Sequence, residues 1–168
     1  MVLSLNYSTI ELFEDETIVD NRLCKQAIER YKKAMFTVQR RVNALIRELM
    51  PADLTVDQYY VIDYIRSHGK CTSSELAEVF CVGKSSITAI MTRLFDKQLV
   101  LRVPDEKDRR VITLLLTGEG ERLANELGAK VEEMLSGYMN LFGEEETERF
   151  LATFEKLAQV IVQPQERG

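Results

Sequence analysis

The sequence predicts a mainly α-helical protein with one small β-hairpin. Most of its segments place apolar residues three and four positions apart, which is the spacing of one face of an α-helix. Two short apolar runs, at residues 99–103 and 111–117, flank a charged loop, an arrangement typical of an antiparallel hairpin. The chain has 168 residues and is 45% hydrophobic, which is enough for a packed core in a single domain.

The longest helix is predicted over residues 21–50, and Pro51 ends it. Its apolar stripe consists of Ile28, Tyr31, Met35, Val38, Val42, Leu45 and Leu49. A rod of about 45 Å carries a longer stripe than one small domain usually covers. We therefore expect a helix–helix dimer surface here, although ordinary packing in the chain's own core would produce the same stripe.

Two shorter helices follow, and each begins with a recognisable cap. Thr55 and Thr72 are each followed three residues later by a Gln or a Glu, which is the spacing of a capping box. In the second of these helices, Leu76, Val79 and Phe80 are predicted to face inward.

The helix after "CVG" has two different faces. The apolar face is predicted to contain Ile87, Ile90, Met91, Leu94 and Phe95. The other face is small and polar, with Lys84, Ser85, Ser86, Thr88, Ala89, Thr92 and Arg93. Because Ser and Thr are poor helix formers, something other than helix propensity favours them here. Small side chains let a helix lie close to base edges, where hydroxyls donate or accept hydrogen bonds and methyl groups contact thymine.

A short helix, a glycine-containing turn and such a second helix have the outline of a helix-turn-helix. A pair of helices used only for packing would share the apolar pattern. The stretch "VLRVPDEKDRRVITLLLT" then adds a hairpin, or wing, directly after the second helix. Lys107, Arg109 and Arg110 would lie near its tip, within reach of a phosphate or a minor groove. Asp108 has the spacing to hold the Arg110 guanidinium in a bidentate pair, although a charged tip can also be merely soluble.

The distribution of charge agrees with a DNA-facing surface in this part of the chain. Residues 84–110 carry seven basic and four acidic residues, a net charge of +3. Since the whole chain has a net charge of −5, the remainder carries −8. Residues 118–168 have five basic and eleven acidic residues and should face away from DNA.

The last third of the sequence predicts two more helices. Thr117 can cap the first, whose stripe would contain Leu123, Leu127, Val131, Met134 or Leu135, and Tyr138. The second would present Phe150, Phe154, Leu157 and Ile161. These stripes exceed what one small lobe needs, so we expect some of them at a dimer interface.

These motifs together resemble the MarR family of winged-helix transcriptional regulators. The stretches "LTVDQYYVIDYI", "TSSELAEVF", "GKSSITAIMTRLFDKQLV" and "DEKDRRVITLLLTGEG" follow the family's order and spacing. The family's wing signature is matched by Asp108, Arg109, Arg110, Leu116, Thr117 and Gly120. Two positions depart from the pattern: Gly83 stands where many relatives have a Ser or Thr cap, and Phe95 replaces an often polar residue.

The resemblance implies a homodimer whose terminal helices interlock and whose two lobes read a pseudo-palindromic DNA operator. The domains would be an N-terminal extension at 1–20 and a single domain at 21–168, with a helical dimerisation region at 21–50 and 118–168 and a winged-helix lobe at 54–117. Arg110 would enter the minor groove with Asp108 as its orienting partner. The implied function is repression of transcription. The alternative is a winged-helix protein-interaction module without DNA binding, which would tend to replace the polar helix face with apolar residues.

Many members of the family release DNA when a phenolic or other aromatic acid binds, and others do so when a cysteine is oxidised. Candidate effector-binding residues are Phe36, Arg40, Tyr59, Tyr60 and His68, with Arg40 meeting a carboxylate. The aromatic residues can equally be core, with Arg40 solvated.

The cysteines, the single histidine and the lack of catalytic motifs bear on three other functions: redox sensing, metal binding and catalysis. Cys24, Cys71 and Cys81 lack CxxC spacing, which fits a reducing compartment. Cys24 is the redox candidate, although Tyr31 occupies the position of the reactive cysteine of peroxide-sensing relatives. Together with the single histidine, His68, the cysteines do not form a recognisable metal site. We expect no cofactor, no enzyme activity and no membrane span, and a cytoplasmic location.

Overall fold

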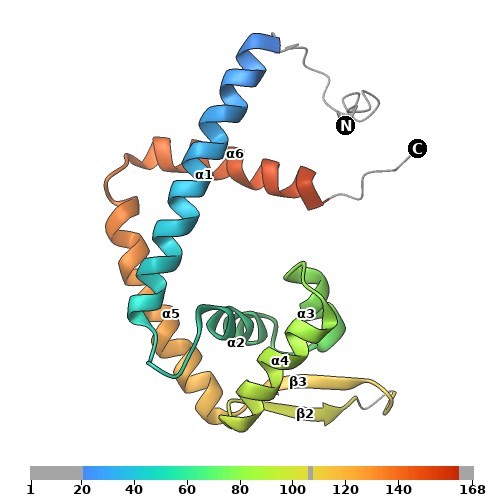
Figure 1. Ribbon diagram of the computed structural model, residues 1–168. Coiled ribbons are helices and arrows are strands. Elements are labelled where there is room, and N and C mark those ends of the chain that lie inside the picture. The colour runs from blue at the N-terminus through green and yellow to red at the C-terminus, as the bar shows by residue number, and fades with distance from the viewer. Residues whose placement is uncertain (1–20, 106–107, 163–168) are drawn as a thin grey trace, which may run out of the picture. The chain divides into compact units, whose positions relative to one another are not determined.

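The computed structural model describes residues 21–105 and 108–162 (Figure 1). Within these residues it contains six helices and a three-stranded antiparallel sheet. The chain divides into two units, Met1–Ala44 and Leu45–Gly168, which are described separately. The predicted extension at 1–20 and the wing residue Lys107 lie outside the described residues. No helix in the described part of the chain is long and apolar enough to cross a membrane.

Helix α1 (Asn21–Leu49) ends just before Pro51, as predicted. Its N-terminal part belongs to the first unit, where the predicted stripe residues Ile28, Tyr31 and Val38 are exposed. Its last residues belong to the second unit, where Ile46 is buried. The apolar periodicity therefore predicts the helix correctly, but none of the seven stripe residues is buried: three are exposed and four are half-buried.

Helices α2 (Val56–His68) and α3 (Ser73–Val79) both begin with the predicted capping boxes. The Gln58 N–H donates to Thr55 Oγ1 at 3.2 Å, and the Thr55 N–H donates to Gln58 Oε1 at 3.0 Å. The inward orientation predicted for Val79 is wrong, because this side chain is 49% exposed. Helix α3 has only seven residues and buries Leu76 and Ala77 instead.

The sheet has the strand order β1-β3-β2, with β1 (Cys71–Thr72), β2 (Val100–Pro104) and β3 (Ile112–Leu116). Strands β2 and β3 form the predicted hairpin, with Val100 opposite Leu116 and Pro104 opposite Ile112. The two-residue strand β1 was not predicted, because it is too short to show any alternation in the sequence. It pairs with β3 and thereby joins the start of α3 to the wing.

The core of the second unit lies between α2, α3, α4 (Lys84–Asp96), α5 (Gly118–Met139) and the sheet. Its fully buried apolar side chains include Val61, Ile62, Ile65, Leu76, Ile87, Met91, Leu94, Leu114 and Leu127. Gly120 is required at the start of α5, because an added Cβ would lie 2.0 Å from the backbone oxygen of Leu99. Beside it, the Thr117 hydroxyl caps α5 by accepting the Gly120 N–H at 2.9 Å.

Helix α6 (Glu144–Val162) is amphipathic as predicted, but the described residues of its own unit do not cover its apolar face. None of its residues, all of which are described, is buried. Phe150 and Phe154 stack with their ring centroids 5.6 Å apart, yet both remain exposed, as does Ile161. Within the described residues of its own unit, the apolar face of α6 is therefore left uncovered.

Candidate nucleic-acid interface

Helix α4 presents the polar face that its sequence predicts. All seven predicted contact residues, Lys84, Ser85, Ser86, Thr88, Ala89, Thr92 and Arg93, are exposed. On the opposite side, Ile87, Met91 and Leu94 are buried in the core, while Ile90 and Phe95 are half-buried. The helix is thus held to the lobe by one face and leaves the small polar face accessible.

The turn between α3 and α4 is tight and leaves α4 without a side-chain cap. The Cys81 N–H donates to the Glu78 carbonyl and the Val82 N–H donates to the Ala77 carbonyl, both at 3.0 Å. Gly83 is the N-cap residue in an extended conformation, and no side chain caps the helix. The helix therefore begins normally despite the unusual glycine. No side chain accepts a hydrogen bond from the first-turn N–H groups of α4. A phosphate oxygen could act as the acceptor in its place.

The threonine hydroxyls on this face are partly committed to the helix itself. Thr88 Oγ1 donates to the Lys84 carbonyl at 2.8 Å, and Thr92 Oγ1 donates to the Thr88 carbonyl at 2.9 Å. A hydroxyl that donates to its own helix keeps its acceptor lone pairs. In this arrangement, Thr88 and Thr92 can offer an acceptor oxygen and a methyl group to a base edge.

The tip of the wing contains the predicted bidentate ion pair. Arg110 Nε donates to Asp108 Oδ1 and Arg110 Nη2 donates to Asp108 Oδ2, both at 3.0 Å. The backbone N–H of Arg110 also donates to Asp108 Oδ1 at 3.0 Å. These hydrogen bonds hold the pKa of Asp108 below its ordinary value and raise that of Arg110. The Arg110 side chain is 91% exposed, so its guanidinium is oriented without being buried.

Backbone hydrogen bonds order the described part of this tip. The Asp105 N–H donates to the Val111 carbonyl at 2.9 Å, and the Val111 N–H donates to the Asp108 carbonyl at 2.8 Å. The Asp108 N–H donates to the Asp105 carboxylate at 3.2 Å. Arg109 is exposed in the same turn. The described part of the tip thus presents the guanidinium groups of Arg109 and Arg110 to solvent.

The base of the wing is joined to the C-terminal end of α4. The Arg102 guanidinium lies over the Phe95 ring, 4.1 Å from its centroid, which is a cation–π geometry. This contact gives a physical reason for an aromatic residue at position 95. Lys97 also forms an ion pair with Asp53, which lowers the pKa of that carboxyl. The wing and helix α4 are therefore connected to each other and to the segment before α2.

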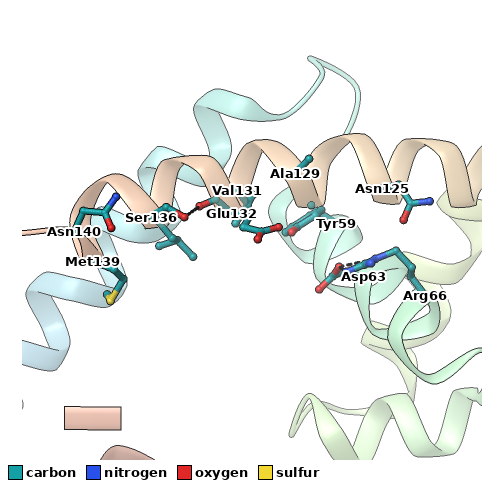
Figure 2. A pocket seen from close by; sticks show the side chains of 12 residues that line it. Tyr59, Asp63, Arg66, Asn125, Ala129, Val131, Glu132, Ser136, Met139 and Asn140 are labelled. Atoms are coloured by element: carbon teal, nitrogen blue, oxygen red, sulfur yellow. Dashed lines mark hydrogen bonds and ion pairs between the residues drawn. The ribbon is translucent and has the colours of Figure 1, made fainter. Parts of the chain in front are cut away.

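A groove lies between α2 and α5, away from the wing, with a cavity volume of about 550 Å³ (Figure 2). Tyr59, Val131 and Met139 supply apolar lining, and the Asp63–Arg66 ion pair lies at one end with a 2.8 Å contact. Burial raises the pKa of Tyr59. The sequence prediction included Tyr59 and missed Asp63 and Arg66. These residues lie four and seven positions after Tyr59, a spacing that would have placed them on the same helix face.

Of the other predicted effector-binding residues, Tyr60 and His68 belong to the same unit and do not line this groove. Tyr60 is half-buried beside Tyr59, with ring centroids 5.6 Å apart, and His68 is exposed and stacks on Tyr64. Phe36 and Arg40 belong to the first unit, where the Arg40 guanidinium lies 5.5 Å from the centroid of the Phe36 ring.

The three cysteines have different environments. Cys24 and Cys81 are exposed, whereas Cys71 is buried. Burial, reinforced by the nearby Glu75 charge, raises the pKa of the Cys71 thiol to about 12. Among the described residues, no group of three or more His, Cys, Asp or Glu side chains could hold a metal ion.

A short helix, a tight turn, an outward-facing polar helix and a hairpin that exposes an oriented arginine at its tip define a winged helix-turn-helix lobe. Comparison with known proteins identifies its family, because the MarR family profile matches residues 54–112. The transcriptional repressor MdtR of Bacillus subtilis is 33% identical over 133 residues, which are 74% of this chain and 86% of that relative.

Two solved structures extend the comparison. A mutant of MarR from Escherichia coli complexed with operator DNA has 26% identity and a TM-score of 0.62, covering 81% of this chain and 96% of that one. NadR in complex with 4-hydroxyphenylacetate has 25% identity and a TM-score of 0.66, and the match covers 79% of this chain and 92% of the NadR chain. The chain belongs to the MarR family of DNA-binding transcriptional regulators, which are not enzymes.

Proposed function

We propose that the chain is a homodimeric repressor that binds a pseudo-palindromic operator. The observation that carries this proposal is the uncovered apolar face of α6, which includes Phe150, Phe154 and Ile161. Large contiguous apolar surfaces on soluble proteins mark interaction sites. A two-fold axis pairs the same surface on two copies and closes the assembly. The exposed stripe of α1 supplies a second surface of the same kind.

Two lobes related by a two-fold axis would read two half-sites about one helical turn apart, roughly 10 base pairs from centre to centre. In each half-site, the polar face of α4 would enter the major groove. Thr88 and Thr92 would accept hydrogen bonds from base amino groups or contact a thymine methyl. Lys84 would neutralise a phosphate near the start of the helix, where the N-cap Gly83 supplies no side-chain acceptor.

The wing would add a contact to the neighbouring minor groove. Arg110 is directed by Asp108 through two hydrogen bonds, so less of its conformational freedom remains to be lost on binding. A narrow minor groove has an enhanced negative potential that attracts an inserted arginine. Arg109 and Lys107 would contact the flanking phosphates. Bound in this way at a promoter, the dimer would block access of the polymerase.

We further propose that a small aromatic effector binds in the groove between α2 and α5. The groove volume of about 550 Å³ lies in the range of small-molecule sites, and Tyr59 provides an aromatic wall. Support comes from NadR, a structural relative solved with 4-hydroxyphenylacetate. An effector with a carboxylate would have to draw Arg66 away from Asp63, or meet another cation. Binding would change the separation of the two α4 helices and weaken both half-site contacts together.

Selection of bound duplexes from a random DNA pool tests the proposal. The selected duplex is then titrated with the purified chain by fluorescence anisotropy at two salt concentrations. We expect an inverted repeat whose affinity falls steeply with salt, because several phosphates are neutralised. Enrichment of no sequence by a folded dimer would contradict sequence-specific DNA binding. Effector candidates, beginning with 4-hydroxyphenylacetate, are tested by their ability to dissociate the selected complex.

A further inference from the structure

Helix α2 contacts two different parts of the second unit through two different faces. One face contributes Tyr59, Asp63 and Arg66 to the groove beside α5 (Figure 2). The next face around the helix contributes Tyr64, which contacts α3 rather than α5. Helix α2 is therefore the element between the groove and the helix-turn-helix, and Tyr64 lies on its helix-turn-helix side.

Tyr64 is hydrogen-bonded to the residue that caps α3. The Tyr64 hydroxyl donates to Glu75 Oε1 at 2.9 Å. The other carboxylate oxygen, Glu75 Oε2, accepts the backbone N–H of Thr72 at 3.4 Å as part of the capping box. The same carboxylate thus completes the start of α3 and connects it to α2. This hydrogen bond raises the pKa of the Tyr64 hydroxyl from its ordinary value.

The ring of Tyr64 also contacts the other end of α3. It meets Phe80, the C-cap residue, edge to face with centroids 6.1 Å apart. On a different side it stacks on His68, with centroids 3.9 Å apart and an interplanar angle of 19°. A single side chain therefore contacts both the start and the end of α3. A helix of seven residues is too short to hold its own geometry, so contacts of this kind determine its orientation.

We propose that Tyr64 is a positioning residue for DNA recognition, which acts through Glu75 to fix α3, and with it the recognition helix α4, relative to α2. Helix α3 packs directly on α4, so a rotation of α3 displaces the polar face of α4. Base-edge contacts depend on that placement, whereas attraction to phosphates depends mainly on charge. Tyr64 is accordingly needed for preference between DNA sequences and much less for general DNA affinity. The inference rests on the proposed operator binding.

The variant Tyr64→Phe tests this inference because it removes only the hydroxyl and keeps the ring between Phe80 and His68. The readout is the ratio of the affinities for the selected operator and for a random duplex of equal length. We expect the ratio to fall about 3- to 10-fold, the range of one lost hydrogen bond, with random-duplex affinity unchanged. The control Ile62→Val removes one buried methyl group from the same helix. It should lower the melting temperature while leaving the ratio unchanged.

A double-mutant cycle with Glu75→Ala shows whether Tyr64 acts through Glu75. In the Glu75→Ala background, Tyr64→Phe should have no further effect on the ratio. An unchanged ratio for the single Tyr64→Phe variant, or full additivity of the two changes, would overturn the inference while leaving operator binding intact. If the wild-type chain itself prefers no sequence, the proposed function fails first, and the two failures are thereby distinguished.

Discussion

Helices α5 and α6 follow each other in the same unit and have similar apolar stripes, but they differ in what covers them. Helix α5 buries Gly120, Ala124, Leu127 and Val131. Helix α6 buries none of its residues and exposes Phe154 and other large apolar side chains. The difference separates two uses of one sequence pattern: the stripe of α5 completes the lobe of its own chain, and that of α6 is the surface that we propose pairs with a second copy.

The largest expected effects come from placing the same charge on each helix. Leu127→Asp buries an unpaired carboxylate, which costs several kcal/mol out of a total stability of about 5–15 kcal/mol, and should unfold the lobe. Phe154→Asp, at a position that is 41% exposed in one chain, should leave the lobe folded and produce monomers. Circular dichroism reports folding, and sedimentation equilibrium reports the mass. A Phe154→Asp chain that is still dimeric would contradict the role given to α6.

A matched pair of glycine substitutions sharpens the same comparison at the start of α5. Gly120→Ala forces a Cβ against the Leu99 carbonyl and should cost about 1–3 kcal/mol or more, as overpacking does. Gly118→Ala, two residues earlier, meets no atom within 4 Å and should be neutral or stabilising by about 0.5 kcal/mol. Urea unfolding measures both. Equal stability of the two variants would show that the close approach to Leu99 is not needed.

Variants on the DNA-facing surface should weaken DNA binding without affecting the dimer. Arg110→Ala removes the oriented guanidinium of the wing and should lower operator affinity by about one to a few kcal/mol if it occupies the minor groove. Arg122→Ala is the control, since it removes an exposed arginine from an ion pair on α5. Anisotropy titration compares the two. Unchanged binding of the Arg110→Ala chain would remove the wing from the mechanism.

Lys84→Ala should have a smaller and less sequence-dependent effect. If Lys84 contacts a phosphate, affinity falls for every duplex and the slope of log affinity against log salt flattens by about one unit. The measurement is a titration at several salt concentrations with the selected operator and a random duplex. An effect confined to one base pair of the operator would instead assign Lys84 to base recognition.

The smallest effect is expected from pH. The hydrogen bonds from Arg110 depress the pKa of Asp108 below its ordinary value of 3.8, so its carboxylate remains charged well below neutrality. Because the pKa of Asp108 is depressed, the ion pair is present at higher pH and is lost only as the pH falls through the depressed pKa. Operator affinity should therefore show no contribution from this pair between about pH 5 and 8. The Asp108→Asn chain, which lacks the charge, should show the same pH profile at a lower affinity.

Local patterns could be predicted from the sequence, and long-range contacts could not. The capping boxes at Thr55 and Thr72 and the Asp108–Arg110 pair depend on residues two or three positions apart, so spacing alone predicts them. The polar face of α4 follows from helical periodicity in the same way. Val79 was placed inward wrongly because periodicity cannot tell where a two-turn helix ends and its buried face stops.

Apart from Asp63 and Arg66, which helical spacing could have identified, the missed features join distant parts of the chain. Residues Cys71 and Thr72 form a strand only because they pair with β3, more than forty residues later in the chain. The hydrogen bond from Tyr64 to Glu75 connects residues eleven positions apart on different helices, and the groove depends on α2 meeting α5. Such contacts are set by packing, which a single sequence does not display. The same limit applies to α6: its apolar stripe predicts a helix but does not say which surface packs against that stripe.

The most direct test of the central claim is the native mass of the chain bound to the selected duplex. We predict two chains on each duplex that carries an inverted repeat, and loss of that complex in the Phe154→Asp variant. A complex of one chain per duplex with full affinity would contradict the claim that α6 pairs two copies to read two half-sites.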